Sequence, residues 1–191
     1  MNGKAISKDF LWGMALGAML SPILIILVYS LVARPQGTSG EISAPPLPEV
    51  QRVSLDWSVQ TLSGETVNLA EVAKDQVVFL NIWATWCGPC IKEMPSIDAL
   101  YKDYKDKVVF VCLSNEAEGV VKDFVDRSPY DFPVYLMKDQ PPQSFLPRSI
   151  PATYIIDSDR VLKVAHEGAA DWSSVAVRKY LDQLVKSEGS E

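Results

Sequence analysis

One segment constrains the fold of this chain more than any other: an apolar run that leads directly into a Cys-x-x-Cys pair. Residues 77–83 (VVFLNIW) are typical of a strand that is buried on both faces. Cys87 follows after three residues, and Gly88, Pro89 and Cys90 come next. Beyond Pro89 the apolar residues recur at helical spacing. The segment therefore predicts a buried strand that turns sharply into a helix, with both cysteines at the start of that helix.

The two cysteines stand where a thiol becomes reactive. The first N–H groups of a helix have no partner inside it, and together with the helix dipole they favour a thiolate at Cys87. We therefore expect Cys87 to be the nucleophile. Cys90, one turn further in and more shielded, is expected to be the resolving thiol that attacks the mixed disulfide. A purely structural disulfide is the alternative, but it would close a loop with only two intervening residues and stabilise the fold little.

A metal site is a second alternative for the cysteine pair. A closed structural zinc site needs four ligands, and only Cys112 and the single His166 remain to complete one. Cys112 lies in an apolar run, which is more typical of a buried, inert thiol. We therefore expect no metal and a redox role for Cys87 and Cys90.

The rest of the domain alternates strand patterns with helix patterns. The expected strands are 53–61 and 66–69 (a hairpin around Ser63-Gly64), 77–83, 107–113, 132–137, 153–157 and 161–165. Helices are expected after Pro89, from Asn115 and near Val175. Asn115 and Glu118 resemble a capping box, which predicts one apolar helix face with Val120, Val121, Phe124 and Val125. This order predicts an α/β domain with a mixed central sheet flanked by helices.

The N-terminal part contains 24 consecutive uncharged residues, 10–33. As a helix this run would be about 36 Å long, enough to cross a hydrocarbon core of roughly 30 Å. A cleavable signal peptide, with an apolar region of about 7 to 15 residues and a small-x-small cleavage site, fits less well. Leu31 stands where Ala33 would need a small residue. A buried core helix is the other alternative, and we favour a transmembrane anchor at 10–33.

Charge places the two sides of this anchor. Lys4 and Lys8 precede the run and Arg34 follows it, which favours residues 1–9 in the cytoplasm and the rest outside the bacterial cytoplasmic membrane. Residues 34–50 contain four prolines and read as a linker before the domain at 51–191. The formal net charge is −6, which disfavours nucleic acid as a partner.

Trp86 and the following Cys-Gly-Pro-Cys match the active-site motif of thioredoxin. The longer string 77–90, with Glu93 and Pro95 downstream, resembles the membrane-anchored or secreted thioredoxin-like family of the TlpA and ResA type. This resemblance implies a thioredoxin fold with an N-terminal β-hairpin extension and a thiol:disulfide oxidoreductase that needs no cofactor. It also implies extracytoplasmic (periplasmic) proteins with disulfides as substrates. Because such a reductase needs electrons, we expect a membrane electron-transfer protein as its reductant.

The resemblance also assigns roles to single residues. Pro151 should follow a cis peptide bond and pack against the cysteines, and the backbone of Ile150 should pair with a bound substrate chain. Trp86 corresponds to the exposed aromatic beside the nucleophile. Thioredoxin has a buried aspartate where this chain has Asn81. In the ResA-like branch a glutamate at the position of Glu93 assists the second thiol, so the resemblance implies a catalytic role for Glu93. The alternative is that Glu93 is a surface carboxylate, which the helix dipole favours near a helix start.

Three other functions are known for, or compatible with, a domain of this kind. The branch dedicated to cytochrome c maturation usually has Pro-Thr between its cysteines, and Gly88-Pro89 here weakens that role without excluding it. A peroxidase on this fold would have threonine at the position of Ala84. A non-catalytic binding or adaptor module is the strongest rival, and the presence of both Cys87 and Cys90 disfavours it.

Overall fold

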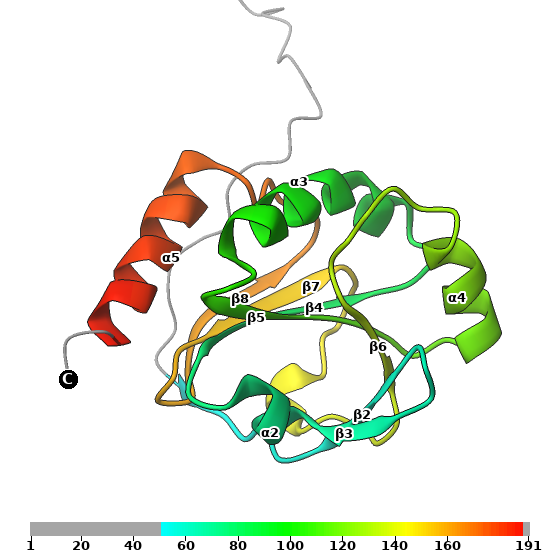
Figure 1. Cartoon of the computed structure of the whole chain (residues 1–191), viewed down its shortest axis with the longest axis horizontal. Coiled ribbons are helices and arrows are strands. Elements are labelled where there is room, and N and C mark those ends of the chain that lie inside the picture. The colour runs from blue at the N-terminus through cyan, green and yellow to red at the C-terminus, as the bar shows by residue number, and fades with distance from the viewer. Residues whose placement is uncertain (1–50, 189–191) are drawn as a thin grey trace, which may run out of the picture. The chain divides into compact units, whose positions relative to one another are not determined.

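An eight-stranded mixed sheet forms the centre of the structure, a computed structural model that describes residues 51–188 (Figure 1). Its strand order is β1-β8-β7-β4-β5-β6-β2-β3. The strands are β1 (Gln51–Arg52), β2 (Ser58–Thr61), β3 (Thr66–Asn68), β4 (Val77–Trp83), β5 (Val108–Ser114), β6 (Val134–Met137), β7 (Ala152–Ile156) and β8 (Val161–Glu167). The helices are α2 (Leu69–Ala73), α3 (Gly88–Tyr104), α4 (Glu118–Val125), η1 (Gln143–Phe145) and α5 (Val175–Glu188).

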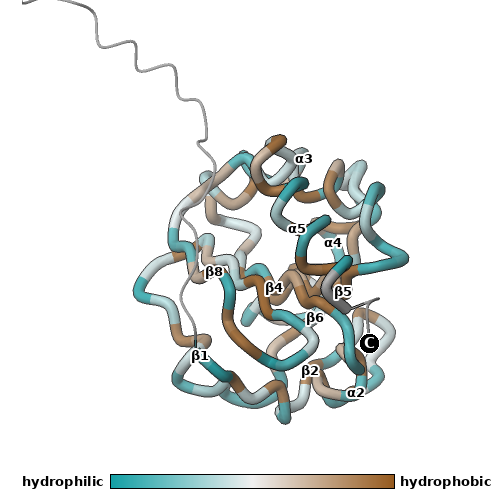
Figure 2. The backbone as a smooth tube through the Cα atoms, turned by 90° about the vertical axis from the view of Figure 1, so that its left-hand side faces the viewer, coloured by the Kyte–Doolittle hydropathy of each residue, from teal (hydrophilic) through white to brown (hydrophobic). Residues whose placement is uncertain are grey.

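Strand β4 is the central strand and matches the predicted range 77–83. It pairs in parallel with β5 and antiparallel with β7, and all seven of its residues are buried. Phe79 faces the layer formed by α3, α4 and α5, whereas Leu80 faces the layer formed by α2 and η1. In Figure 2 the colour along β4 marks mainly hydrophobic residues. The predicted α/β architecture, with a mixed sheet between helices, is therefore confirmed.

The expected N-terminal hairpin is also confirmed, as β2 and β3, although β2 begins at Ser58 and not at residue 53. Its turn contains Gly64 at φ +87°, a left-handed conformation that glycine adopts without steric cost. Strand β2 also pairs with β6, with Thr61 opposite Tyr135. The hairpin therefore continues the central sheet instead of forming a separate layer.

Helix α4 begins later than the sequence pattern predicts. Ala117 is its N-cap, and no side chain caps its first turn, so the expected capping box of Asn115 and Glu118 is absent. Val121 is buried, but Val120 is 49% exposed, because neighbouring residues on a helix point about 100° apart. The helix expected near Val175 is present as α5, and Val175 itself is exposed at its first position.

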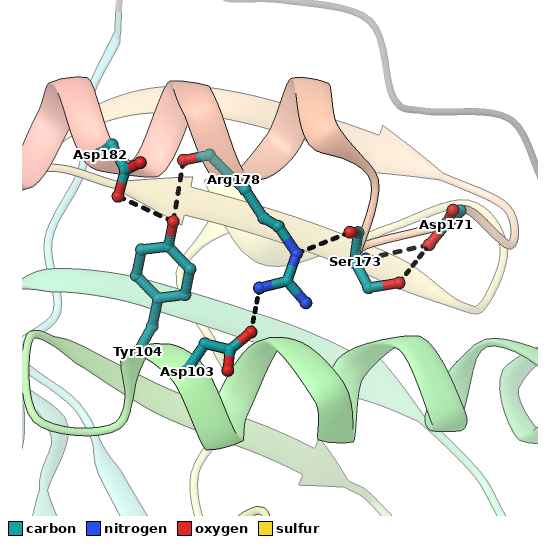
Figure 3. Close-up of polar contacts among 6 residues, drawn as sticks. All are labelled: Asp103, Tyr104, Asp171, Ser173, Arg178 and Asp182. Carbon is teal, nitrogen blue, oxygen red and sulfur yellow. Dashed lines mark hydrogen bonds and ion pairs between the residues drawn. The ribbon is translucent and has the colours of Figure 1, made fainter.

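A polar cluster joins α5 to the end of α3 (Figure 3). The buried Tyr104 hydroxyl lies 2.8 Å from Asp182 Oδ1 and 3.0 Å from the Arg178 carbonyl oxygen, and it can donate to either. The Arg178 guanidinium forms an ion pair with Asp103. Burial, and next the neighbouring Asp182, raises the pKa of Tyr104 to about 12, so the hydroxyl remains a donor at neutral pH. These contacts hold α5 in a defined position on α3.

Replacing Tyr104 by Phe is expected to lower the free energy of unfolding by about 1.5 kcal/mol, because it removes a hydrogen bond to a charged acceptor. Urea unfolding of residues 51–188 measures this change. Tyr101→Phe is the matched control on the same helix, because the Tyr101 ring packs on Phe110 and its hydroxyl has no hydrogen bond within residues 51–188. An equal loss in both variants would show that the hydroxyl of Tyr104 contributes nothing specific.

Within residues 51–188, no helix combines the length and apolar character needed to cross a membrane. The expected cytoplasmic segment 1–9, anchor 10–33 and linker 34–50 lie outside the described residues.

Candidate active site

The cysteine pair lies at the junction between the central strand and helix α3, as predicted. Cys87 is the N-cap of α3, and its sulfur accepts a hydrogen bond from the backbone N–H of Cys90 at 3.2 Å. A disulfide joins Cys87 to Cys90, with an S–S distance of 2.01 Å and Cα atoms 5.2 Å apart. Cys87 is 4% exposed and Cys90 1% exposed. When the pair is reduced, a helix N–H directed at the Cys87 sulfur favours its thiolate.

Strand β7 carries the expected proline to the same place. Ala152 is opposite Ile82 near the end of β4, so Pro151 lies where the active-site turn begins. The Ile150-Pro151 peptide bond is cis, as the resemblance implied. The Pro151 carbonyl oxygen accepts a hydrogen bond from the Gly168 N–H at 2.7 Å. The N–H and C=O of Ile150, in contrast, have no hydrogen-bond partner within residues 51–188, so a bound extended chain can pair with them.

A groove of about 370 Å³ lies beside this turn and is lined mainly by apolar side chains. Trp86, 73% exposed, and Ile150 both line it, so the structure brings together two of the predicted substrate-binding residues. Much of the remaining lining comes from the connection between β6 and β7, including Leu146 and Pro147. No motif in the sequence indicated this wall, although prolines at 141, 142 and 147 signal an irregular segment.

Glu93 is a buried carboxyl and not a surface one. It is 1% exposed and accepts three hydrogen bonds. Asn81 Nδ2 donates to Oε1 at 2.8 Å, while Trp172 Nε1 and the Ala170 N–H donate to Oε2 at 2.9 and 3.1 Å. Burial raises its pKa from 4.5 to about 7, and the donated hydrogen bonds, Trp172 first, offset part of that rise. The interpretation of Glu93 as a solvated helix-start residue is therefore wrong.

The Glu93 carboxyl is one helical turn away from the second thiol, Cys90. Glu93 follows Cys90 by three residues in α3, and residues at this spacing share one face of a helix. A group with a pKa near 7 can accept and return a proton at neutral pH. Asn81, which holds Glu93 Oε1, also donates to Thr153 Oγ1 at 2.8 Å and thereby ties β4, α3 and β7 together.

The loop before α5 supplies two of the three donors to Glu93, and several contacts hold it. The backbone N–H of Trp172 donates to Ser96 Oγ at 3.1 Å, and the Ser96 hydroxyl donates to the Glu93 carbonyl oxygen at 2.7 Å. Arg178 Nε donates to the Ser173 carbonyl oxygen at 2.8 Å (Figure 3). The role of Trp172 could not be predicted from the sequence, because a residue 79 positions from Glu93 carries no local signal of this contact.

Cys112 and His166, the other candidate ligands, do not form a metal site with the cysteine pair within residues 51–188. Cys112 is fully buried, and burial, followed by the nearby Glu93 carboxylate, raises the pKa of its thiol strongly, as expected for an inert cysteine. The His166 ring packs edge-on against Trp172, and burial lowers its pKa. Among residues 51–188, no three His, Cys, Asp or Glu residues form a group that could hold a metal ion.

The fold and this site define a class: a thioredoxin-like domain with a redox-active Cys-x-x-Cys pair at the start of a helix. The model of the AhpC/TSA family matches residues 50–165. The thiol-disulfide oxidoreductase ResA of Bacillus cereus is 30% identical over 169 residues, which are 87% of this chain and 96% of ResA. The chain belongs to the AhpC/TSA family and is a thiol-disulfide oxidoreductase of the ResA type.

Two further proteins are similar to this chain. The thioredoxin-like protein YneN of Bacillus subtilis is 38% identical over 117 residues, which are 59% of this chain and 68% of YneN. The crystal structure of the exposed lipoprotein thioredoxin of Streptococcus pneumoniae is similar with a TM-score of 0.56 at 24% identity. It covers 68% of this chain and 99% of that protein, and it supports the fold alone.

Proposed function

We propose that this oxidoreductase is held in the bacterial cytoplasmic membrane by residues 10–33, with residues 1–9 in the cytoplasm, and reduces disulfides of extracytoplasmic proteins. One observation carries the redox part: the Cys87–Cys90 pair stands at the start of α3 with an ionisable, buried Glu93 one turn beyond Cys90. The membrane placement is supported by the uncharged run and by the charges that flank it.

The reaction begins with reduced Cys87. Its thiolate attacks one sulfur of the substrate disulfide, that S–S bond breaks, and the other substrate sulfur leaves as a thiolate that takes a proton from water. Glu93 then accepts the proton of the Cys90 thiol, and the Cys90 thiolate attacks the Cys87 sulfur of the mixed disulfide. The remaining substrate sulfur leaves as a thiolate and is protonated. Two electrons have moved to the substrate, and Cys87–Cys90 is now a disulfide.

The groove favours protein substrates over small disulfides. Its apolar lining can take side chains that flank a substrate cysteine, while the unpaired backbone groups of Ile150 can pair with an extended chain. Trp86 provides a large exposed surface on which such a chain can pack. We therefore assign substrate contact to Trp86 and Ile150, which line the groove, and to Pro151, which follows Ile150 after a cis peptide bond.

Each cycle leaves an oxidised pair that needs two electrons before it can act again. We assign this step to the dithiol of a membrane electron-transfer protein, which would reduce Cys87–Cys90 by the same exchange chemistry. The Cys-Gly-Pro-Cys sequence resembles that of thioredoxin, whose potential of about −270 mV suits a reductant.

Replacement of Cys90 by Ser in the full chain should trap the substrate. The Cys87 thiolate still forms the mixed disulfide, but no resolving thiol remains to release it. In cells producing this variant, we expect mixed-disulfide adducts on non-reducing gels, and dithiothreitol should cleave them. Mass spectrometry should identify the trapped partners as disulfide-containing extracytoplasmic proteins. Wild-type protein should accelerate the reduction of insulin by dithiothreitol.

Two controls make this experiment decisive. Cys87→Ser combined with Cys90→Ser should trap nothing, and Cys112→Ser combined with Cys90→Ser should trap as much as Cys90→Ser alone. Adducts with cytoplasmic proteins would contradict the membrane placement. No adducts, together with no insulin reduction by wild type, would favour the adaptor function. Trapped proteins with Cys-x-x-Cys-His haem-attachment sites would point to cytochrome c maturation.

A further inference from the structure

Glu116 connects the loop between β5 and α4 to the turn that leads into the cysteine pair. It lies between β5 and α4, and its carboxylate accepts two hydrogen bonds from Thr85, which stands in the turn between β4 and α3. The Thr85 N–H donates to Oε2 at 2.6 Å, and the Thr85 hydroxyl donates to Oε1 at 2.8 Å. Both carboxylate oxygens are thus used on one residue that is 31 positions away in the sequence.

The carboxylate is itself held in place by the end of β5. The buried Ser114 hydroxyl lies 3.2 Å from Glu116 Oε2 and 3.2 Å from the Glu116 N–H. It can accept from that N–H and donate to the carboxylate. Glu116 therefore reaches the active-site turn from a fixed point at the end of a buried strand, and not from a loose loop.

The turn that Glu116 holds carries the reactive residue. Thr85 lies between Ala84 and Cys87. The Cys87 N–H donates to the Ala84 carbonyl oxygen at 3.1 Å and closes this turn. Trp86, the next residue after Thr85, is largely exposed and lines the groove. A shift of Thr85 would therefore move both the Trp86 side chain and the Cys87 sulfur.

The loop that carries Glu116 also borders the groove. Asn115, the preceding residue, lines the same groove as Trp86 and Ile150. The carboxylate of Glu116 thus fastens the wall that contains Trp86 to the wall that contains Asn115. The Glu116 side chain contacts Thr85 and does not cap α4, whose first turn has no side-chain cap.

We propose that Glu116 is a positioning residue that sets the distance between these two walls and aligns Cys87 with a disulfide presented by a protein chain. This inference rests on the proposed function. Attack on a disulfide needs the three sulfurs in line, and a displacement of about 1 Å at a reacting centre can cost as much as 10²-fold in rate. A small disulfide that approaches from open solvent does not need the groove and should be insensitive to its width.

Glu116→Ala should therefore separate two activities of the reduced full-length protein. We expect kcat/KM for insulin reduction to fall about tenfold, while the rate with the small disulfide DTNB changes less than about twofold. Thr85→Val, which removes the hydroxyl bond only, should fall between wild type and Glu116→Ala, and Thr85→Ser should restore the wild-type ratio. Glu118→Ala, an exposed glutamate in the first turn of α4, is the matched control and should behave as wild type.

A purely structural role would reduce both activities together, because it would lower the amount of folded protein. Equal losses with insulin and DTNB, or no loss with either, would overturn the proposal. Should Glu116→Ala fail to fold by circular dichroism, Thr85→Val and Thr85→Ser supply the same comparison. If wild-type protein reduced DTNB but not insulin, the proposed function itself would fail, and that result is distinct from an unchanged ratio in the variants.

Discussion

Replacing Glu93 by Gln is expected to remove a pH-dependent loss of stability of about 3 kcal/mol from this domain. The pKa of Glu93 is raised from 4.5 to about 7 in the folded protein, so at intermediate pH the folded state keeps a proton that the unfolded chain releases. Its contribution to stability is therefore full below pH 4.5 and is lost as the pH rises through about 7. The free energy of unfolding of wild type should fall across this range relative to that of Glu93→Gln.

Urea unfolding at pH 4.5, 6 and 8 measures this difference, and comparing variants removes the contribution of all other groups that titrate. Glu118→Gln, at an exposed position, should keep the pH dependence of wild type. Glutamine is nearly the same size as glutamate, and rotation of the Asn81 amide would let it keep hydrogen bonds in the site. Parallel stability curves for wild type and Glu93→Gln would contradict a pKa near 7.

The same variant should also slow the release of substrate. Without a carboxylate to accept the proton of Cys90, we expect resolution of the mixed disulfide to be about 10²-fold slower at pH 7. Rapid-quench measurement with a protein disulfide should show the mixed disulfide of Cys87 accumulating. An unchanged resolution rate across pH 6 to 8 would exclude Glu93 as the proton acceptor.

Replacing Asn81 by Asp is expected to lower the free energy of unfolding by about 3 to 5 kcal/mol at pH 8. Asn81 is 2% exposed and donates hydrogen bonds to Glu93 and Thr153, both at 2.8 Å. An aspartate cannot donate when ionised, and it would place a second carboxylate beside the first inside the core. Because Glu93 already places one carboxyl in this part of the core, we expect the neighbouring position 81 to need an amide and not a second acid.

A double variant tests that explanation directly. Glu93→Gln combined with Asn81→Asp restores one carboxyl and one amide, so it should recover about 2 kcal/mol of the loss caused by Asn81→Asp. Asn115→Asp is the control at an exposed site and should change stability by less than about 0.5 kcal/mol. Additive losses in the double variant would show that the two side chains do not interact.

The fold was largely predictable because its signals are local. The continuous apolar run at 77–83 belongs to a strand covered on both faces, and burial of all seven residues confirms it. Ser63-Gly64 predicted the hairpin, since the turn needs a residue with positive φ. The predicted start of α4 was wrong: the helix begins only after Ala117, and the preceding Glu116 contacts Thr85, a residue of another loop that no local pattern could indicate.

The sequence by itself determined the reactive pair and its place, because the strand, the turn and the helix start that create a reactive Cys87 are adjacent in the chain. Only the tertiary structure decided the state of Glu93. Its burial and its donors come from Asn81, Ala170 and Trp172, which are 12, 77 and 79 positions away. A pKa depends on the groups that surround a carboxyl in space, and those groups come together only when the sheet and α5 have packed against α3.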